Sequence, residues 1–292
     1  MMIRHGTWLA LFPMLSWAAA LVPGEATVAG RDGRMTARWE KNFLRIRGER
    51  VPGGEIEINY LEAYCRPEST DRDWRETVIG HVTEKLLARE DGLLIRLKDT
   101  LRDGVVVEHN ITVGADEVDF RLVAHNPTRT VSPVHWAQPC VRVDRFTGSP
   151  RDDFRTLVPA YARKCFIFLD GKLTRLPTTP WADKARYTPG QVYVPRHVDR
   201  HDVNPRPVSA LTPSHGLTGC FSADEKMILA MAWEPYQELF QGVIGCLHSD
   251  FRVGGLKPGE TKHIRGKLYI VPADLDALFK RYQKDFPEQQ NK

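Results

Sequence analysis

Polar and apolar residues alternate along several short segments of this chain, and this period of two constrains the fold more than any other feature. Alternating runs lie at residues 55–60, 93–97, 105–113 and 118–122, and the turn signals Asp91-Gly92, Asp103-Gly104 and Gly114-Ala115-Asp116 separate them. Successive side chains of a strand point to opposite faces, and Asp-Gly is a strong hairpin signal because glycine tolerates positive φ. The alternation therefore predicts an antiparallel meander with one face on the core and one in water.

The strand pattern continues through most of the chain and becomes helical only at the end. A hairpin is expected around Asp170-Gly171, because a turn pair separates two apolar runs. Further strands are expected at residues 217–222, 227–233, 243–248 and 263–271. Residues 274–286 place apolar side chains three and four apart, which is typical of an amphipathic helix. The predicted fold class is all-β, a large antiparallel β-sandwich with a C-terminal α-helix.

The N-terminus has the composition of an export signal. Arg4 and His5 give a short basic start, residues 7–21 are mainly apolar, and small residues follow. The apolar run is shorter than the roughly 20 residues that a membrane-spanning helix needs, although a buried N-terminal helix is the alternative. We therefore expect a signal peptide, an extracytoplasmic location (periplasmic or secreted), and no membrane insertion of the mature chain.

The remaining chain is expected to form one domain. The predicted division is a signal peptide at 1–26 and a single β-sandwich domain at 27–292, with the C-terminal helix at 274–286. Residues 177–213 are rich in proline and show little periodicity. A long irregular segment inside a compact domain is usually functional, so we expect an ordered flap over one face.

Charge and cysteine spacing exclude several classes of function. The net charge is only +4, with basic and acidic residues interleaved, so no nucleic-acid partner is expected. None of the five cysteines have the C-x-x-C spacing of zinc knuckles or thioredoxin-like motifs. The sequence favours buried, unreactive thiols. The alternative is that one or two disulfide bonds form, because the chain is expected to be exported. With no P-loop, dinucleotide fingerprint or serine nucleophile elbow, the sequence predicts no cofactor.

The segment Trp233-Glu234-Pro235-Tyr236-Gln237, directly after an apolar strand, concentrates the chemistry of the chain. A carboxylate between aromatic and amide side chains suits a neutral, hydroxyl-rich ligand such as a sugar. Glu234 is the candidate base, and Trp233, Tyr236 and Gln237 are candidate substrate contacts. A strand-end carboxylate paired with a surface arginine or lysine is the alternative.

A second cluster combines His135, Trp136 and Gln138. Imidazole, indole and amide groups together can donate to hydroxyls and stack on a sugar ring, so His135 is the candidate acid and its neighbours are candidate substrate contacts. A hydrogen-bonded structural histidine is the alternative. His248 is a further candidate substrate contact if the fold brings it near Glu234.

Two polar loops offer other chemistries. Arg66 lies in the polar stretch 64–74 and could bind a carboxylate or vicinal hydroxyls, with an internal salt-bridge network as the alternative. Residues 197–202 contain two histidines and two aspartates. Histidines four apart bind one metal readily on a helix, but prolines flank this run, so no metal site is predicted and a cation held by the loop is the alternative.

Two motif pairs carry a family resemblance. Val123-Ala124-His125-Asn126-Pro127-Thr128 precedes Ser132-Pro133-Val134, and Ala232-Trp233-Glu234-Pro235-Tyr236-Gln237 precedes Leu256-Lys257-Pro258-Gly259-Glu260. In this order they resemble the galactose-mutarotase-like superfamily, whose supersandwich is the fold of aldose epimerases. The resemblance covers roughly residues 117–271 and implies that Glu234 occupies the position of the catalytic base. The position of the superfamily's histidine acid falls near Cys140 or Val141, about six residues after His135.

Two hypotheses follow, and both have a carbohydrate or glycan as the partner. In the first, the chain is an exported enzyme, epimerase/mutarotase-like or polysaccharide-lyase-like, with Glu234 as base and His135 as acid. In a lyase, Arg66 would neutralise a uronate. In the second, the same groups hold a glycan without catalysis, as a binding module of an extracytoplasmic assembly. The sequence leaves the choice between enzyme and binding module open.

Overall fold

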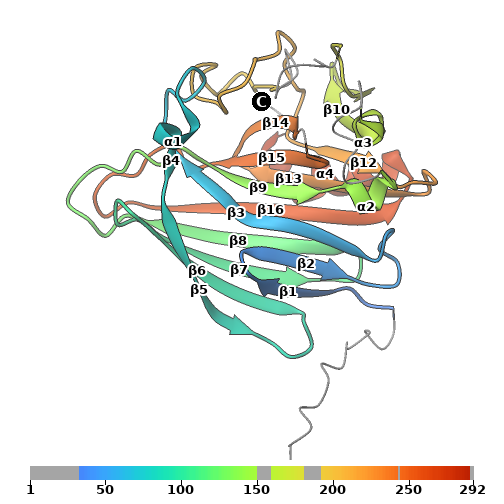
Figure 1. Cartoon of the computed structure of the whole chain (residues 1–292), viewed down its shortest axis with the longest axis horizontal. Coiled ribbons are helices and arrows are strands. Elements are labelled where there is room, and N and C mark those ends of the chain that lie inside the picture. The colour runs from blue at the N-terminus through green and yellow to red at the C-terminus, as the bar shows by residue number, and fades with distance from the viewer. Residues whose placement is uncertain (1–32, 150–158, 181–191, 243, 290–292) are drawn as a thin grey trace, which may run out of the picture.

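The computed structural model describes residues 33–149, 159–180, 192–242 and 244–289. In this part of the chain the strands form two antiparallel sheets packed face to face (Figure 1). The seven-stranded sheet has the order β1-β2-β3-β9-β15-β14, with β4 paired to β3. Its strands are β1 (Thr36–Glu40), β2 (Phe43–Arg47), β3 (Glu55–Cys65), β4 (Val78–Ile79), β9 (Trp136–Arg142), β14 (Tyr236–Gly242) and β15 (Cys246–Arg252).

The nine-stranded sheet has the order β11-β10-β12-β13-β16-β8-β7-β6-β5. Its strands are β5 (His81–Ala88), β6 (Leu94–Leu101), β7 (Val106–Val113), β8 (Glu117–His125), β10 (Cys165–Leu169), β11 (Lys172–Arg175), β12 (Thr218–Phe221), β13 (Met227–Glu234) and β16 (Thr261–Pro272). The strands β5 to β8 pair in chain order, as the alternating runs and Asp-Gly turns predict. The hairpin of β10 and β11 also forms at the predicted turn. The fold class predicted from the sequence is confirmed.

One face of each sheet contributes to a shared apolar core. Leu44 and Ile46 of the smaller sheet and Ile95, Leu97 and Phe120 of the larger sheet are almost completely buried in it. These residues stand at alternate positions, so their neighbours point away from the core. Alternation therefore decides which side chains lie between the sheets and which lie on the outer faces.

A buried polar network joins the two sheets through this core. The His109 ring on β7 lies between Tyr60 of β3 and Asp99 of β6, with Nδ1 2.9 Å from the tyrosine hydroxyl and Nε2 3.0 Å from the carboxylate. Tyr64 of β3 donates to the same carboxylate at 2.6 Å. All four side chains are buried, and each polar contact depends on the others because water is excluded.

The C-terminal helix α4 (Leu275–Asp285) covers the outer face of the larger sheet, as predicted. The Asp274 side chain caps its first turn by accepting from the Ala277 N–H at 3.0 Å. Leu278, Tyr282 and Phe286 pack against outward-facing aromatic and aliphatic side chains of β10, β12, β13 and β16. The three-and-four spacing thus marks the face of α4 that contacts the sheet.

The expectation that only the end of the chain is helical is wrong. Short helices α1 (Trp74–Thr77), α2 (Asp144–Thr147) and α3 (Ala160–Lys164) lie in connections, and the 3-10 helix η2 (Pro287–Gln289) follows α4. Each is too short to show an apolar repeat, which explains why the sequence pattern missed them.

Some expectations concern residues that the structure describes only in part. The predicted signal peptide at residues 1–26 lies outside the described residues, as do residues 181–191 of the predicted flap. None of the helices in the described ranges is long and apolar enough to cross a membrane. All five cysteines are buried and free.

Candidate functional site

The outward face of β9, β14 and β15 is polar and is covered by residues 192–215, and we call it the covered face. Tyr193 forms a backbone bridge with Leu239 of β14, and the Asn204 N–H donates to the Glu238 carboxylate at 3.0 Å. Figure 1 shows this segment above β14 and β15. Apolar contacts between Val192, Val203 and other valines of the segment and Phe240 hold it there. The outward-facing polar side chains of these strands would otherwise be exposed, and the covering segment buries them.

One end of the covered face carries a histidine–carboxylate pair. His135 Nδ1 lies 2.8 Å from Asp202 Oδ2, and the Arg252 guanidinium donates to the same oxygen at 3.1 Å. Arg252 also donates to Gln237 Oε1 at 2.7 Å, and the Gln237 amide donates to the Asp202 carbonyl. The imidazole is 25% exposed, whereas the Asp202 side chain is 5% exposed. A buried carboxylate thus fixes the orientation of a partly accessible imidazole.

The middle of the covered face is acidic. Gln138 donates to Glu62 at 2.8 Å and accepts from the Asn204 amide at 2.8 Å. Burial, and then the nearby Asp250, raise the pKa of Glu238 well above its usual value. Burial likewise raises the pKa of Asp250 to about 6. These carboxyl groups therefore hold protons more tightly than exposed ones do.

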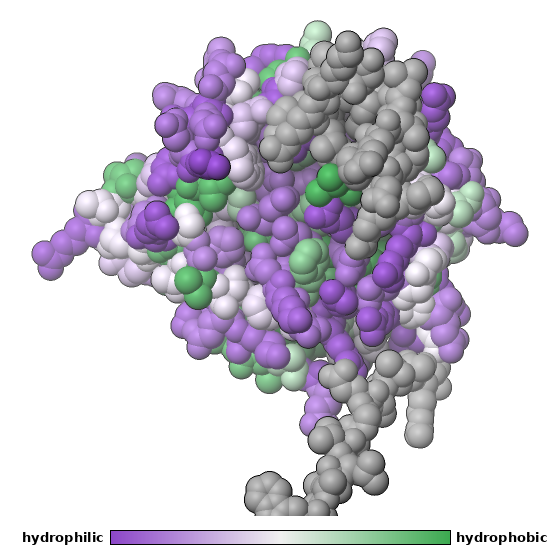
Figure 2. Space-filling view, viewed as in Figure 1, coloured by the Kyte–Doolittle hydropathy of each residue, from purple (hydrophilic) through white to green (hydrophobic). Residues whose placement is uncertain are grey.

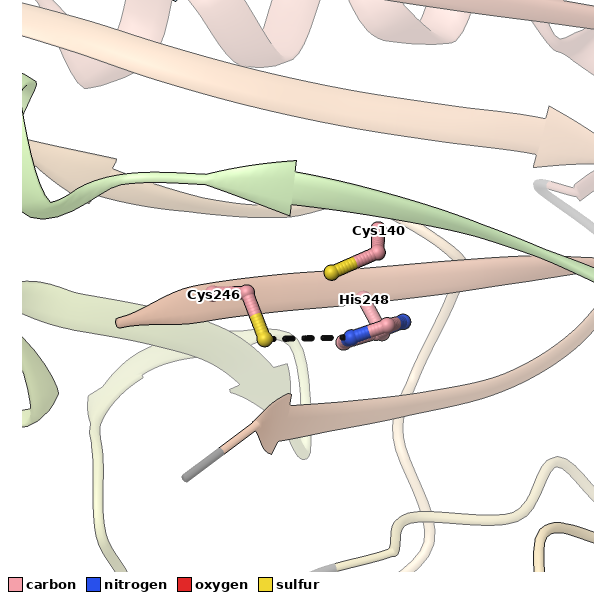
Figure 3. Close-up of side chains that lie close together, drawn as sticks. All are labelled: Cys140, Cys246 and His248. Carbon is pink, nitrogen blue, oxygen red and sulfur yellow. Dashed lines mark hydrogen bonds between the residues drawn. The ribbon is translucent and has the colours of Figure 1, made fainter. Parts of the chain in front are cut away.

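A cluster of two thiols and an imidazole occupies the other end of the covered face (Figure 3). Cys246 Sγ lies 3.3 Å from His248 Nε2, and Cys140 stands next to both. Burial alone would lower the pKa of His248, but the Cys246 sulfur and the Asp250 carboxylate raise it to about 10. A hydrogen bond from Cys140 and the charge of His248 hold the pKa of Cys246 well below its usual value.

Beside the covered face, a pocket of about 530 Å³ opens between the segment 195–215, the β10–β11 turn and the C-terminal end. Its lining residues are Asp170, Pro195, Arg196, His197, Thr212, Pro213, Ser214, His215, Tyr236 and Gln289. Asp170, Arg196 and His197 are exposed, whereas His215, Tyr236 and Gln289 are buried. The lining is a mixture of hydroxyl, amide, imidazole and aromatic groups, which can form hydrogen bonds with a polar ligand.

Glu234 reaches this pocket through one intermediate residue. The Gln289 amide donates to Glu234 Oε2 at 2.8 Å and to the Trp233 carbonyl at 2.6 Å. The Gln289 carbonyl oxygen accepts from the Gly216 N–H at 3.0 Å. Glu234 is half-buried, and the pocket lining contains Gln289 but not Glu234. The Glu234 carboxylate therefore orients the side-chain amide of Gln289. For Glu234 to contact a ligand in the pocket, the Gln289 side chain would have to move.

His215 forms part of the pocket wall with an unpartnered donor. Its ring packs against Phe168, Phe279 and Tyr282, with centroid distances of 4.6, 5.1 and 4.8 Å. The Leu217 N–H donates to Nδ1 at 3.3 Å, whereas Nε2 is buried with no hydrogen-bond partner among the described residues. Burial lowers the pKa of His215 to about 4, so the ring is neutral at neutral pH.

The structure brings some predicted residues together and separates others. Tyr236 lines the pocket, and Glu234 stands behind it. His135 and Gln237 meet through Asp202 and Arg252 at one end of the covered face. Glu234 and His135, predicted as a base and an acid, are thus held by different partners: Gln289 holds Glu234, and Asp202 holds His135.

Five other predicted contacts are occupied by protein groups, and four of them are almost completely buried. Gln138 is 3% exposed and is held by Glu62 and Asn204. Trp233 is 4% exposed and packs between Phe120 and Phe251 in the core. Trp136 is completely buried and donates to Ser69 at 3.2 Å. His248 is 1% exposed and belongs to the thiol cluster.

Arg66 is the fifth of these residues. It donates to the carbonyls of Val78 at 2.7 Å and Glu76 at 3.2 Å, which stabilises the connection through α1. The loop 197–202, for which a bound cation was only the alternative to the prediction of no metal site, is divided between two regions. His197 contacts Tyr236, whereas Asp202 binds His135 and Arg252.

Sequence reasoning missed three kinds of site residue. Asp202 and Arg252 lie far apart in sequence, and nothing in their local pattern indicates that they share His135. Gln289 follows the predicted helix and gave no signal of its own. Cys246 was missed although it did carry a signal, because it stands two positions before the candidate His248 and residues two apart in a strand point to the same face.

Comparison with known proteins gives structural likenesses only. No protein-family model and no curated protein sequence matches the chain. A putative aldose 1-epimerase from Escherichia coli is similar at a TM-score of 0.40 and 10% identity, over 81% of this chain and 98% of the other. A galactose mutarotase-like protein from Lactobacillus casei is similar at a TM-score of 0.40 and 8% identity, over 81% and 99%.

A third likeness is to a much larger enzyme. An α-mannosidase from Enterococcus faecalis is similar at a TM-score of 0.45 and 7% identity, over 89% of this chain but 31% of the mannosidase. The galactose-mutarotase-like superfamily, which the sequence motifs resemble, is thus represented among the similar structures. Identities and TM-scores this low do not assign an activity to the chain.

Proposed function

We propose that this chain is an extracytoplasmic carbohydrate-binding protein that holds a sugar in the pocket at Tyr236. The observation that carries the proposal is the pocket itself, with a volume of about 530 Å³ and a lining of hydroxyl, amide, imidazole and aromatic groups. Pockets of roughly 300–1,000 Å³ suit small ligands. Arg196 and Asp170 at the exposed rim can each bind ligand hydroxyls, whereas Tyr236 and His215, which are 3% and 7% exposed, offer only a small part of their rings. The composition of residues 1–26 supports export.

Binding without catalysis fits the placement of the polar groups. A general base must come within hydrogen-bond reach of the proton that it removes. Glu234 is one hydrogen-bonded residue behind the pocket lining, and the neutral imidazole of His215 is buried. The groups that face the pocket can thus bind a sugar with the side chains in their present positions, whereas catalysis by Glu234 needs Gln289 to move.

A panel of monosaccharides, oligosaccharides and uronates tests this proposal on the full chain. Binding is measured by calorimetry and by saturation-transfer NMR. Thr212→Trp places a large side chain in the pocket wall, and we expect it to weaken binding at least about tenfold, or about 1.4 kcal/mol. Thr100→Trp is the matched control, since Thr100 is exposed on β6 of the larger sheet. Equal binding by both variants would place the ligand elsewhere.

A sugar-converting enzyme is the second proposal, and the His135–Asp202 pair favours it. The carboxylate at Nδ1 leaves the Nε2 atom of a partly exposed imidazole as the atom that can exchange a proton. In this scheme Glu234 is the base of an epimerase-like or lyase-like reaction. Glu234→Gln keeps the shape and the contact with Gln289 but removes the base. Loss of turnover with binding retained supports the enzyme, and absence of turnover in the wild type on the whole panel rejects it.

A further inference from the structure

Two neighbouring strands bring two thiols and an imidazole together on the covered face. Cys246 and His248 are two positions apart on β15, so their side chains share a face. The register pairs Leu247 with Val141 of β9, which places His248 beside Cys140. The ligand atoms of the three side chains all lie within 4.8 Å of one another (Figure 3). We propose that Cys140, Cys246 and His248 bind a zinc ion.

The distance between the Cys246 sulfur and His248 Nε2 suits zinc with a small adjustment. Zinc binds thiolate sulfur at about 2.3 Å and imidazole nitrogen at about 2.0 Å, so tetrahedral ligand atoms lie roughly 3.6–3.8 Å apart. The Cys246 sulfur and His248 Nε2 are 3.3 Å apart, within a few tenths of an ångström of that geometry. Two thiolates select a soft cation over calcium or magnesium. Three protein ligands leave the fourth zinc position to water or another small ligand.

The surroundings orient the imidazole as a metal ligand requires. Asp250 Oδ1 lies 3.5 Å from His248 Nδ1, so Nε2 is the nitrogen that faces the sulfur. A carboxylate behind a histidine is the usual outer partner of a histidine that binds zinc. Phe240 stacks on the imidazole with centroids 4.1 Å apart and an angle of 8° between the rings, which fixes the ring plane. The orientation is thus set before any ion enters.

A glycine makes room for one of the sulfurs. Gly242 of β14 pairs with Cys246, and a Cβ atom at Gly242 would lie 2.1 Å from the Cys246 sulfur. Any side chain at this position would therefore displace the sulfur from the cluster. The His248 ring also lies close to this position, with Nε2 3.4 Å from the same Cβ, so the glycine leaves room for both groups.

Buried polar atoms beside the cluster lack hydrogen-bond partners in the part of the chain that the structure describes. They are His248 Nδ1 and both carboxylate oxygens of Asp250, and their 3.5 Å ion pair lacks hydrogen-bond geometry. Orphaned buried polar groups are rare in native proteins and call for an ion or a water. A cation on Nε2 would hold the proton on Nδ1 and draw the ring into a hydrogen bond with Asp250.

Metal analysis of the full-length chain tests the proposal directly. The chain is reduced, incubated with zinc and desalted. We then expect about one zinc ion per chain by inductively coupled plasma mass spectrometry. Cys246→Ser and Cys140→Ser should lose it, and Asp250→Asn should bind it about 10–100-fold more weakly. Cys220→Ser is the matched control and should keep the zinc, because Cys220 is also a buried strand thiol that faces another cysteine, Cys165.

A measurement on the wild type keeps the proposal testable if the cysteine variants fail to fold. Cobalt(II) added to the reduced chain should give a thiolate-to-cobalt charge-transfer band and the intense visible bands of tetrahedral cobalt. Absence of both bands and of zinc would overturn the proposal, and so would zinc that persists in Cys246→Ser. A Cys140–Cys246 disulfide with no metal bound after its reduction would also overturn it. None of these results depends on sugar binding, so the two proposals fail independently.

Discussion

Burial of His215 in the pocket wall makes the stability of the protein depend on pH. The ring is 7% exposed, and burial lowers its pKa from 6.5 to about 4. Below pH about 6.5 the unfolded chain takes up a proton at this residue, whereas the native ring stays neutral until pH falls to about 4. The free energy of unfolding is therefore highest above this window and falls by about 1.4 kcal/mol for each pH unit within it.

The size of the effect follows from the two pKa values. Between about pH 7.5 and about pH 4.5 the contribution of His215 falls by about 2.5 kcal/mol. Urea unfolding followed by tryptophan fluorescence measures the free energy of unfolding at both pH values. His215→Asn is the comparison, because the amide oxygen of the introduced asparagine can still accept from the Leu217 N–H but does not titrate. The wild type should lose about 2.5 kcal/mol more than the variant on acidification. An equal loss in both proteins would refute the buried, neutral imidazole.

Two further substitutions test the core that positions the site. Gly266→Ala should destabilise the fold by about 1–3 kcal/mol, because a Cβ atom there would lie 2.3 Å from the Trp233 ring; thermal unfolding measures this. Asp99→Ala should lower the free energy of unfolding by about 3–5 kcal/mol in urea, because it leaves His109 and the Tyr64 hydroxyl buried without their acceptor. An Asp99→Ala variant with near-native stability would contradict the buried network.

Matched controls separate these effects from a general sensitivity to substitution. Gly80→Ala should change stability little, because its Cβ would meet only the flexible end of Arg102, at 3.4 Å. Asp119→Ala should cost no more than about 1 kcal/mol, because its partner Arg121 is 52% exposed. Losses in the controls as large as those in the core variants would contradict the packing account.

The sequence predicts the half-buried meander and misses β14, a strand that is buried on both faces. The meander β5–β8 was predictable because its alternate residues face water and its turns contain Asp-Gly. Tyr236–Gly242 contains Gln237, Glu238 and Gln241, yet every residue of β14 is buried. Its polar side chains are satisfied by the covering segment and by α3, so no alternation marks it as a strand. The local alternation of polar and apolar residues indicates which side chains of a strand are exposed. In β14 the distant residues 192–215 cover the side chains that would otherwise be exposed.

The candidate site was predictable only where its residues are neighbours in sequence. The segment from Trp233 to Gln237 drew attention correctly to the region beside the pocket, since Tyr236 lines it. The sequence could not show that Gln289 would stand between Glu234 and the pocket. The cysteines were expected to be inert thiols because most of them lie in apolar, strand-like runs. The position of Cys140 beside His248 depends on the β9–β15 register, which no local motif encodes.

Hydrogen–deuterium exchange of the full chain with and without sugar tests the central claim, that the pocket at Tyr236 is a ligand site. With a sugar that binds, the backbone amides of residues 212–215 should become protected, because these residues form part of the pocket wall. The far hairpin of β5 and β6 should exchange at an unchanged rate. If no sugar of the panel binds, or if protection falls only outside the pocket wall, the pocket is not a carbohydrate site.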